Sequence, residues 1–269
     1  MLIFAREASY SPRLRFERVA RETGAVDPGR RGWLAGFAAA AALAALGGRA
    51  QGLRAQPGAA RMQPVGVIGA GHIGGTIGGL WVQAGHPVLF SSRHPDELRP
   101  LAQAGSVAQA IAFADVVLLA VPYKALPEIA RDYGRALSGK VVIDATNAFR
   151  ERDGDAGALA LRDGIGITTA RFLPGARVVR AFNFMAAAAF ASESHHAGEP
   201  VAVPIAGDDP QALRVAKQLV RDAGFEPVVV GGRASADSFA PGGPLFHQIG
   251  SAQAMRERIA RLPNPAGAR

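Results

Sequence analysis

The residues with the clearest chemical spacing form a glycine loop. Gly69, Gly71 and Gly74 make a G-x-G-x-x-G pattern between the apolar run Val65–Ile68 and the helical segment Ile73–Ala84. In a strand–loop–helix unit of this kind, the first glycine permits a tight turn, the second lets a pyrophosphate approach the backbone, and the third lets the helix pack on the strand. The helix N-terminus supplies N–H groups and a positive dipole to the phosphates. We therefore predict a dinucleotide site whose loop residues are Gly69, Ala70, Gly71, His72, Ile73 and Gly74.

The residue at the end of the second strand, about 20 residues after the glycine loop, distinguishes sites for NAD from sites for NADP. A site for NAD usually has Asp or Glu there, accepting a hydrogen bond from the ribose 2′-hydroxyl. This chain has Ser91, Ser92 and Arg93 instead. Hydroxyls and a guanidinium can bind a 2′-phosphate, which a carboxylate would repel. The pattern predicts NADP(H) as the cofactor.

Three later strands end in residues that could complete the site. In open α/β sheets, ligands bind at the carboxyl ends of the strands, so these ends should face one crevice. We expect Val121 and Pro122 to lie along the cofactor, and Thr146 and Asn147 to hydrogen-bond near the nicotinamide. Asn183 is the candidate for holding the substrate.

These residues must be positioned by a repeating strand–helix pattern that begins at Pro64. Short apolar runs alternate with helical segments, which predicts an α/β fold with a doubly wound, Rossmann-type, mostly parallel sheet of seven or eight strands and a small C-terminal extension. The predicted strands are Val65–Ile68, Val88–Phe90, Val116–Val121, Val141–Ala145, Val178–Phe182, Val201–Ala206 and Pro227–Val230. The predicted helices cover Ile73–Ala84, 95–103, 106–113, Leu126–Leu137, a weak stretch at 156–173, 210–223 and 251–261.

No general acid, base or metal site is predicted. Tyr123 and Lys124 are candidate acid–base groups, but a position on the rim of the crevice is favoured for each. The pair His195-His196 has no third ligand at useful spacing, so a solvated turn is favoured over a metal site. The chain has no cysteine, which excludes disulfides, thiol nucleophiles and Cys-ligated metals.

The first 61 residues are predicted to be a signal-like extension and linker, followed by the nucleotide-binding domain at 62–269. Arg30-Arg31 directly precedes a 14-residue run, Trp33–Leu46, that is rich in Ala and Leu. The run suits a signal peptide and is short for a membrane span, and an arginine pair before it resembles a twin-arginine export signal. We expect export to the periplasm. The alternative is a cytoplasmic protein that starts at Met62.

The net charge of +8 resides mostly in that extension. Residues 1–61 hold 10 basic and 4 acidic side chains, whereas the remaining residues hold 20 and 18. Binding to a nucleic-acid backbone needs basic residues clustered on the folded domain. We therefore expect no nucleic-acid partner.

Together these motifs resemble a known family. The glycine loop, the Ser91-Ser92-Arg93 turn, the strand end Asp144-Ala145-Thr146-Asn147 and the strand Arg180-Ala181-Phe182-Asn183 are similar to NADPH-dependent reductases of the coenzyme F-420 (deazaflavin) type, whose domain also occurs in STEAP-like metalloreductases. The resemblance covers about Pro64 to Ile249. It implies hydride transfer between NADP(H) and a planar redox acceptor, and a homodimer. After Asn183 this chain departs from the family, with Phe184-Met185 where the family usually has Thr.

The short tail favours the same interpretation. Reductases of small metabolites related to pyrroline-5-carboxylate reductase generally enclose the substrate with a second helical domain, and only 39 residues follow Val230 here. A planar acceptor that stacks on the nicotinamide needs less enclosure. Two alternatives stay open: a non-catalytic NADP(H)-binding module that senses redox state, and a small-metabolite dehydrogenase.

Overall fold

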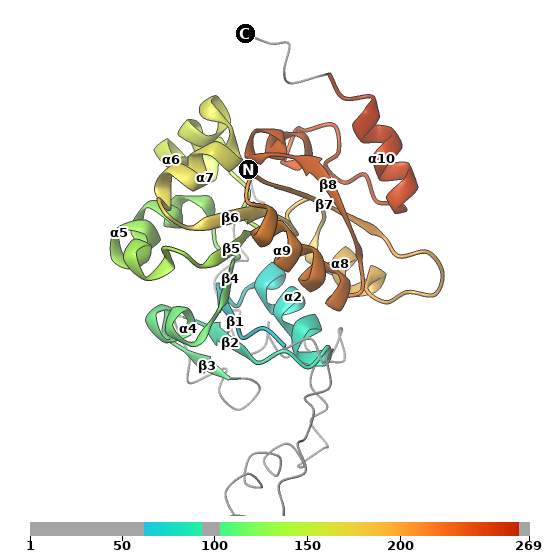
Figure 1. Ribbon diagram of the computed structural model, residues 1–269. Coiled ribbons are helices and arrows are strands. Elements are labelled where there is room, and N and C mark those ends of the chain that lie inside the picture. The colour runs from blue at the N-terminus through green and yellow to red at the C-terminus, as the bar shows by residue number, and fades with distance from the viewer. Residues whose placement is uncertain (1–61, 93–102, 264–269) are drawn as a thin grey trace, which may run out of the picture.

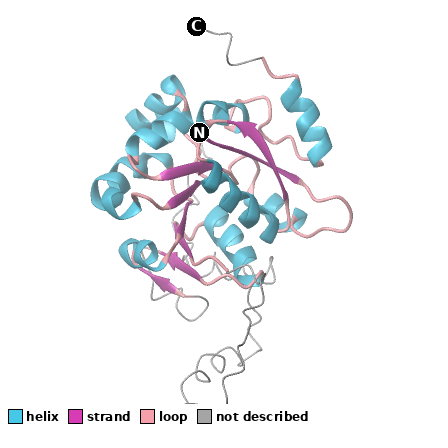
Figure 2. Ribbon diagram, viewed as in Figure 1, coloured by secondary structure: helices cyan, strands magenta, loops and turns pink. Residues whose placement is uncertain are grey.

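The computed structural model describes residues 62–92 and 103–263. Within them, one sheet of eight strands runs through the molecule with helices on both faces (Figures 1 and 2). Its strand order is β3-β2-β1-β4-β5-β6-β7-β8. The strands are β1 (Val65–Ile68), β2 (Val88–Ser91), β3 (Ala104–Gly105), β4 (Val116–Leu119), β5 (Val141–Asp144), β6 (Arg177–Arg180), β7 (Ala202–Gly207) and β8 (Glu226–Gly231).

Every strand pair in this sheet is parallel except β6 with β7, which is antiparallel. The order reverses between β1 and β4, the point at which doubly wound folds bind nucleotides. The central strands β1, β4 and β5 are buried along their whole length, which explains their continuous apolar sequences. The predicted doubly wound, mostly parallel fold is confirmed.

Helices cover the two faces of the sheet as separate groups (Figure 1). The helices are α2 (His72–Gln83), α4 (Val107–Phe113), α5 (Leu126–Leu137), α6 (Arg150–Asp163), α7 (Ile165–Phe172), α8 (Ala187–Glu193), α9 (Pro210–Asp222) and α10 (Ala252–Ala260), with 3-10 turns η1 (Tyr123–Ala125) and η2 (Arg233–Phe239). Helix α2 packs with α8 and α9, while α5, α6 and α7 pack together on the other side. Among the described residues, no helix is both long and apolar enough to cross a membrane.

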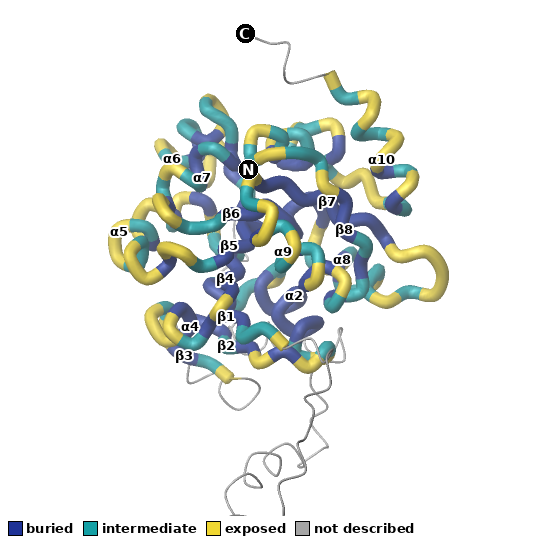
Figure 3. The backbone as a smooth tube through the Cα atoms, in the orientation of Figure 1, coloured by how far each residue is buried: buried dark blue, intermediate teal, exposed yellow. Residues whose placement is uncertain are grey.

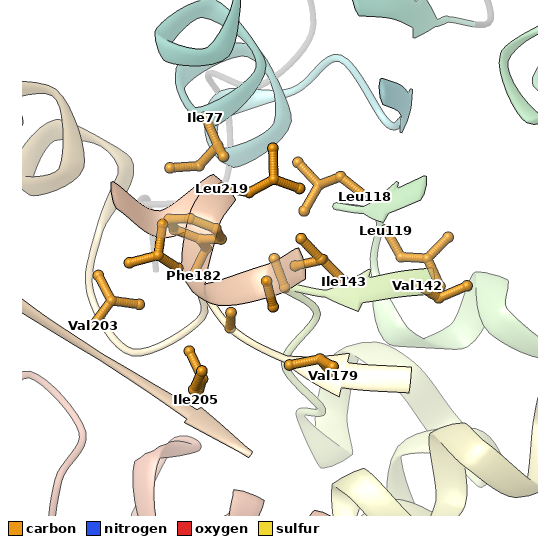
Figure 4. Packing of buried hydrophobic residues seen from close by; sticks show 14 of the residues in the cluster. Ile77, Leu118, Leu119, Val142, Ile143, Val179, Phe182, Val203, Ile205 and Leu219 are labelled. Carbon is orange, nitrogen blue, oxygen red and sulfur yellow. The ribbon is translucent and has the colours of Figure 1, made fainter. Parts of the chain in front are cut away.

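The core lies between the sheet and these helices, where the backbone is almost continuously buried (Figure 3). Ile77 of α2 and Leu219 of α9 pack toward strand residues such as Leu118 (Figure 4). The indole Nε1 of buried Trp81 donates to the backbone oxygen of Leu219 at 2.7 Å. Helix α2 is therefore fixed to α9 by a hydrogen bond as well as by apolar packing.

The structure differs from the sequence-based elements in three places. Strand β3 and helix α8 were not predicted, because two residues carry no periodicity and a seven-residue Ala-rich segment has no cap signal. Helix α6 begins at Arg150, six residues before the predicted start, and has a kink at Gly154 (φ +53°) that breaks its helical pattern. The segments 1–61 and most of the predicted helix at 95–103 lie outside the described residues.

Candidate dinucleotide-binding site

Two glycines of the loop are required by the packing of the protein itself. Gly69 has φ +99°, and a Cβ there would lie 2.5 Å from the oxygen of Ala120. A Cβ on Gly74 would lie 2.0 Å from the oxygen of Gly69. Both contacts are too short for any side chain. These two glycines let α2 leave β1 in a tight turn and pack against it.

Gly71 is different, because no described residue lies within 4 Å of the position that its Cβ would take. It is the N-cap of α2, with φ −83° and ψ −157°, a conformation open to other residues. No side chain caps this helix and its first turn has no acidic residue, so its N-terminal dipole is available to an anion. The sequence predicts that the pyrophosphate of a dinucleotide approaches the backbone here. His72 and Ile73, on the first turn, are exposed and half-buried respectively.

The end of β2 lies directly beside this loop. The backbone N–H of Ala70 donates to the oxygen of Ser91 at 3.3 Å. Ser91 is buried, and Ser92 is half-buried with its backbone N–H donating to the oxygen of Gly105. The predicted 2′-phosphate residues Ser91 and Ser92 therefore adjoin the glycine loop. Arg93 lies outside the described residues.

The end of β4 forms the other side of the loop. A Cβ on Gly69 would lie 2.9 Å from Cγ1 of Val121, so Val121 borders the glycine turn. Pro122 is exposed and begins η1. Lys124 is exposed as well.

The prediction that Tyr123 lies on the rim is wrong. The side chain is fully buried, and its hydroxyl lies 3.2 Å from Oγ1 of Thr169 on α7. Burial raises the pKa of Tyr123 above its usual value. The 3-10 turn η1 directs the ring toward α7. No local sequence pattern predicts this contact between distant segments. Tyr123 is therefore unsuited to proton transfer with a ligand in the crevice.

Two asparagines from different strand ends meet through both of their amides. Nδ2 of Asn147 donates to the backbone oxygen of Asn183 at 2.7 Å, and Nδ2 of Asn183 donates to Oδ1 of Asn147 at 3.1 Å. Nδ2 of Asn183 also donates to the oxygen of Phe239 at 3.2 Å, whereas its buried Oδ1 has no partner among the described residues. The structure thus brings together the predicted nicotinamide-side residue and the predicted substrate residue.

Thr146 is directed into the protein. It is buried, and its hydroxyl donates to Oδ1 of Asp144 at 2.6 Å. Its backbone oxygen accepts from Nη2 of Arg180 at 2.7 Å. Its side chain therefore braces the end of β5, and its contact with a cofactor stays a prediction. Asp144 ends a buried strand, as expected.

Phe182 holds an unusual backbone conformation next to Asn183. Its φ is +59°, which is rare for an aromatic residue. Its ring is fully buried and makes edge contacts with Trp81 and Phe190, with centroids 5.7 Å apart in each pair. These aromatic contacts offset the strain of the turn. The turn directs Asn183 toward Asn147. The sequence does not predict this turn, because a positive φ at a residue other than glycine has no sequence signature.

A pocket of about 270 Å³ opens where the chain continues beyond Asn147. Small and apolar side chains form most of its wall, and Asp237 is the carboxylate in it. The residues around it are Ala148, Ala160, Leu161, Ile165, Asp237, Ala240, Pro241, Gly242 and Gly243. Over the described ranges, no group of three or more His, Asp or Glu is arranged to hold a metal ion.

Comparison with known proteins identifies the first part of this fold. Residues 64–148, from β1 to the end of β5, match the family model for NADP oxidoreductase, coenzyme F420-dependent. The sequence of this segment is similar to that family. The match covers the glycine loop, the Ser91-Ser92 turn, Val121 and Asn147, so the family expected from the motifs is confirmed there. The matched family comprises NADP oxidoreductases, which supports NADP(H) as the cofactor and oxidoreduction as the class of chemistry.

Solved structures agree over a longer stretch. A hypothetical protein from Sinorhizobium meliloti is 29% identical, with a TM-score of 0.59, over 69% of this chain and 93% of that one. A proposed F420-dependent NADP reductase from Arthrobacter sp. FB24 is 22% identical, with a TM-score of 0.52, over 65% of this chain and 87% of that one, and shares the fold.

A curated protein is similar to this chain over part of its length. The metalloreductase STEAP3 of Rattus norvegicus is 28% identical over 179 residues, which are 64% of this chain and 34% of the relative. The chain thus spans about a third of that relative's length.

Proposed function

We propose that this protein is an NADPH-dependent reductase that passes a hydride to a planar redox acceptor, such as a deazaflavin or a flavin-like molecule. The observation that carries the proposal is the open space over Gly71. Its neighbours Gly69 and Gly74 are explained by the fold, whereas Gly71 is not. A glycine that the protein's own packing does not require is explained by the approach of a ligand to the backbone.

The residues of the chain act on NADPH by holding and orienting it. The glycine loop and the N-terminus of α2 would hold the pyrophosphate, and Ser91, Ser92 and Arg93 would hold the 2′-phosphate. Val121 and Pro122 would flank the nicotinamide half. When bound, NADPH supplies a hydride, and transfer between two aligned rings depends on positioning more than on acid–base groups. The burial of Tyr123 agrees with such chemistry.

The pocket beyond Asn147 supports an acceptor with a flat apolar face. It lies between Ala148 and the loop from Ala240 to Gly243, close to the paired amides of Asn147 and Asn183. The described chain after β8 comprises η2, a short loop and α10. A planar acceptor that stacks on the nicotinamide needs little enclosure by the protein.

The experiment is to follow the loss of NADPH absorbance when the purified full chain is mixed with one acceptor at a time. The panel contains a deazaflavin, a flavin, a quinone, a ferric chelate, an imine and a hydroxy acid or its keto form. We expect turnover with at least one planar acceptor. Tight NADPH binding without reduction of any acceptor favours a redox-sensing module, and turnover with the imine or keto acid alone favours a small-metabolite dehydrogenase.

Two further features belong to this proposal. We propose export by the twin-arginine-like segment at Arg30-Arg31, on the strength of its sequence. The family resemblance supports a homodimer, which light scattering of the purified protein tests.

A further inference from the structure

One buried carboxylate joins two loops of the candidate site. The Asp153 side chain, on the first turn of α6, is fully buried. Its Oδ1 accepts from the backbone N–H of Lys124 at 3.2 Å, and its Oδ2 accepts from the backbone N–H of Phe149 at 2.9 Å. Lys124 belongs to the turn after β4, and Phe149 follows the end of β5. A single side chain thus ties together the backbones that follow two neighbouring strands.

The adjacent cation extends this connection to Asn147. Nη2 of Arg152 donates to Oδ2 of Asp153 at 2.8 Å and to the backbone oxygen of Asn147 at 2.6 Å. The guanidinium carbon lies 4.6 Å from the ring centroid of Phe149, which adds a cation–π contact. Asn147 in turn pairs with Asn183 through both amides. The contacts therefore lead from Asp153, through Arg152, to the two asparagines at the crevice.

The carboxylate stays ionised while it does this. Burial alone would raise the pKa of Asp153, but hydrogen bonds from Arg152 and from the backbone N–H groups of Phe149 and Lys124 hold that pKa below its usual value. An ionised carboxylate only accepts hydrogen bonds, and it makes stronger bonds than a neutral group does. The ionised carboxylate of Asp153 can therefore accept from Lys124, Phe149 and Arg152 at the same time.

We propose that Asp153 is a positioning residue for hydride transfer, which together with Arg152 fixes the loops after β4 and β5 so that Val121, Pro122 and Asn147 present one rigid wall to the nicotinamide and the acceptor. The proposal rests on the proposed reductase function. None of the contacts of Asp153 reaches the glycine loop or the Ser91-Ser92 turn. Asp153 is therefore expected to affect the rate of hydride transfer far more than the binding of NADPH.

The test compares Asp153→Ala and Asp153→Asn with the wild-type full chain. Asp132 supplies a matched control, because its carboxylate also pairs with the preceding arginine, at 2.8 Å, but lies exposed on α5. Three quantities are measured: hydride-transfer rate with the best planar acceptor, NADPH Kd by titration, and hydrogen–deuterium exchange at the amides of Lys124 and Phe149. The exchange readout needs neither cofactor nor activity.

We expect Asp153→Ala to lower the hydride-transfer rate by about tenfold to a hundredfold, the range that small misplacements of reacting groups produce. NADPH Kd should change by less than about threefold, since the phosphate contacts are untouched. Both amides should exchange faster. Asp153→Asn retains one accepting oxygen and should fall between Asp153→Ala and wild type, while Asp132→Asn should match wild type.

Two results overturn the proposal. One is a wild-type rate in Asp153→Ala despite faster exchange at both amides. The second is a loss of NADPH affinity as large as the loss of hydride-transfer rate, which would indicate that the substitution destabilises the whole protein. If Asp153→Ala does not fold, the same comparison is made with Asp153→Asn: its loss of hydride-transfer rate is set against its change in NADPH Kd. A wild-type protein that reduces no acceptor rejects the proposed function instead, so the two failures are distinguishable.

Discussion

Arg180 on β6 and Asp144 on β5 form an ion pair with 2.7 Å between Nη1 and Oδ2, and both side chains are fully buried. The two residues stand opposite each other in the register of the parallel strands. Removing two charges from water costs several kcal/mol for each ion, so such a pair depends on further hydrogen bonds. Thr146 supplies them, since its hydroxyl and N–H donate to Asp144 and its backbone oxygen accepts from Arg180. The pair thereby fixes the strand end that carries Asn147.

The first prediction concerns this buried pair. Arg180→Met should lower the free energy of unfolding by about 3–5 kcal/mol, because Asp144 keeps a buried charge with no cation beside it. Urea denaturation measures the loss. Arg177→Met, on the same strand, removes a partly exposed pair with Asp209 and should cost about 1 kcal/mol or less. The double variant Asp144→Asn/Arg180→Met should recover part of the loss. Equal costs for the two single variants would contradict this prediction.

The second prediction separates the glycines of the loop. Gly71→Ala should change the free energy of unfolding by less than about 0.5 kcal/mol, since its Cβ would meet no atom of the described residues. It should weaken NADPH binding at least about tenfold, because the methyl group occupies the space intended for the pyrophosphate. Gly74→Ala should instead destabilise the fold by about 1–3 kcal/mol, the usual cost of overpacking. Thermal unfolding and NADPH titration test both variants. Unchanged NADPH affinity in Gly71→Ala would remove the main support for the site.

The third prediction concerns cofactor choice. Arg93→Ala should weaken NADPH binding by about 1.5–3 kcal/mol, or roughly 10–150-fold, because a charge-assisted bond to the 2′-phosphate is lost. NADH binding should hardly change, since NADH lacks that phosphate. Calorimetric titration with both nucleotides tests this, with Arg131→Ala on α5 as an exposed control. Equal losses for NADPH and NADH would show that Arg93 does not read the 2′-phosphate.

The fourth prediction concerns acid stability. The pKa of Asp153 is lower in the folded protein than its ordinary value of 3.8. A carboxyl of this kind stabilises the fold above its unfolded-state pKa, and that contribution is lost as pH falls toward the folded-state pKa. Asp153→Asn should therefore be less stable than wild type at neutral pH, and the difference should shrink below about pH 4. Urea denaturation at a series of acidic pH values measures it. A difference that stays constant across the series would show that the ionised carboxyl is not the stabilising form.

The fifth prediction concerns export. Residues 1–61 fused to a reporter should direct it to the periplasm of a bacterial host that has the twin-arginine pathway. Replacing Arg30 and Arg31 by Lys should retain the reporter in the cytoplasm. The matched control replaces Arg13 and Arg15 by Lys, at a distance from the apolar run. Retention of the unaltered fusion, or equal export of both variants, would favour a cytoplasmic protein that starts at Met62.

The sequence by itself determined the elements that are encoded locally. Continuous apolar runs predicted the central strands. The helix predicted at 210–223 is confirmed as α9, where the side chain of the N-cap Asp209 accepts from the N–H groups of Gln211 and Ala212. The spacing of Gly69, Gly71 and Gly74 predicted the nucleotide loop, because a backbone that must turn tightly and approach a phosphate favours glycine. These features depend on neighbours within a few residues, and one sequence is enough to read them.

Only the tertiary structure decided which side chains meet. Asn147 and Asn183 are separated by 36 residues and pair because β5 and β6 are adjacent in the sheet. Tyr123 packs under the crevice against Thr169, and Asp153 bonds to Lys124 across 29 residues. Such contacts depend on strand order and helix packing, which produce no periodic pattern in the sequence. The motifs therefore predicted where the cofactor site lies, and the fold decided which residues surround the predicted site.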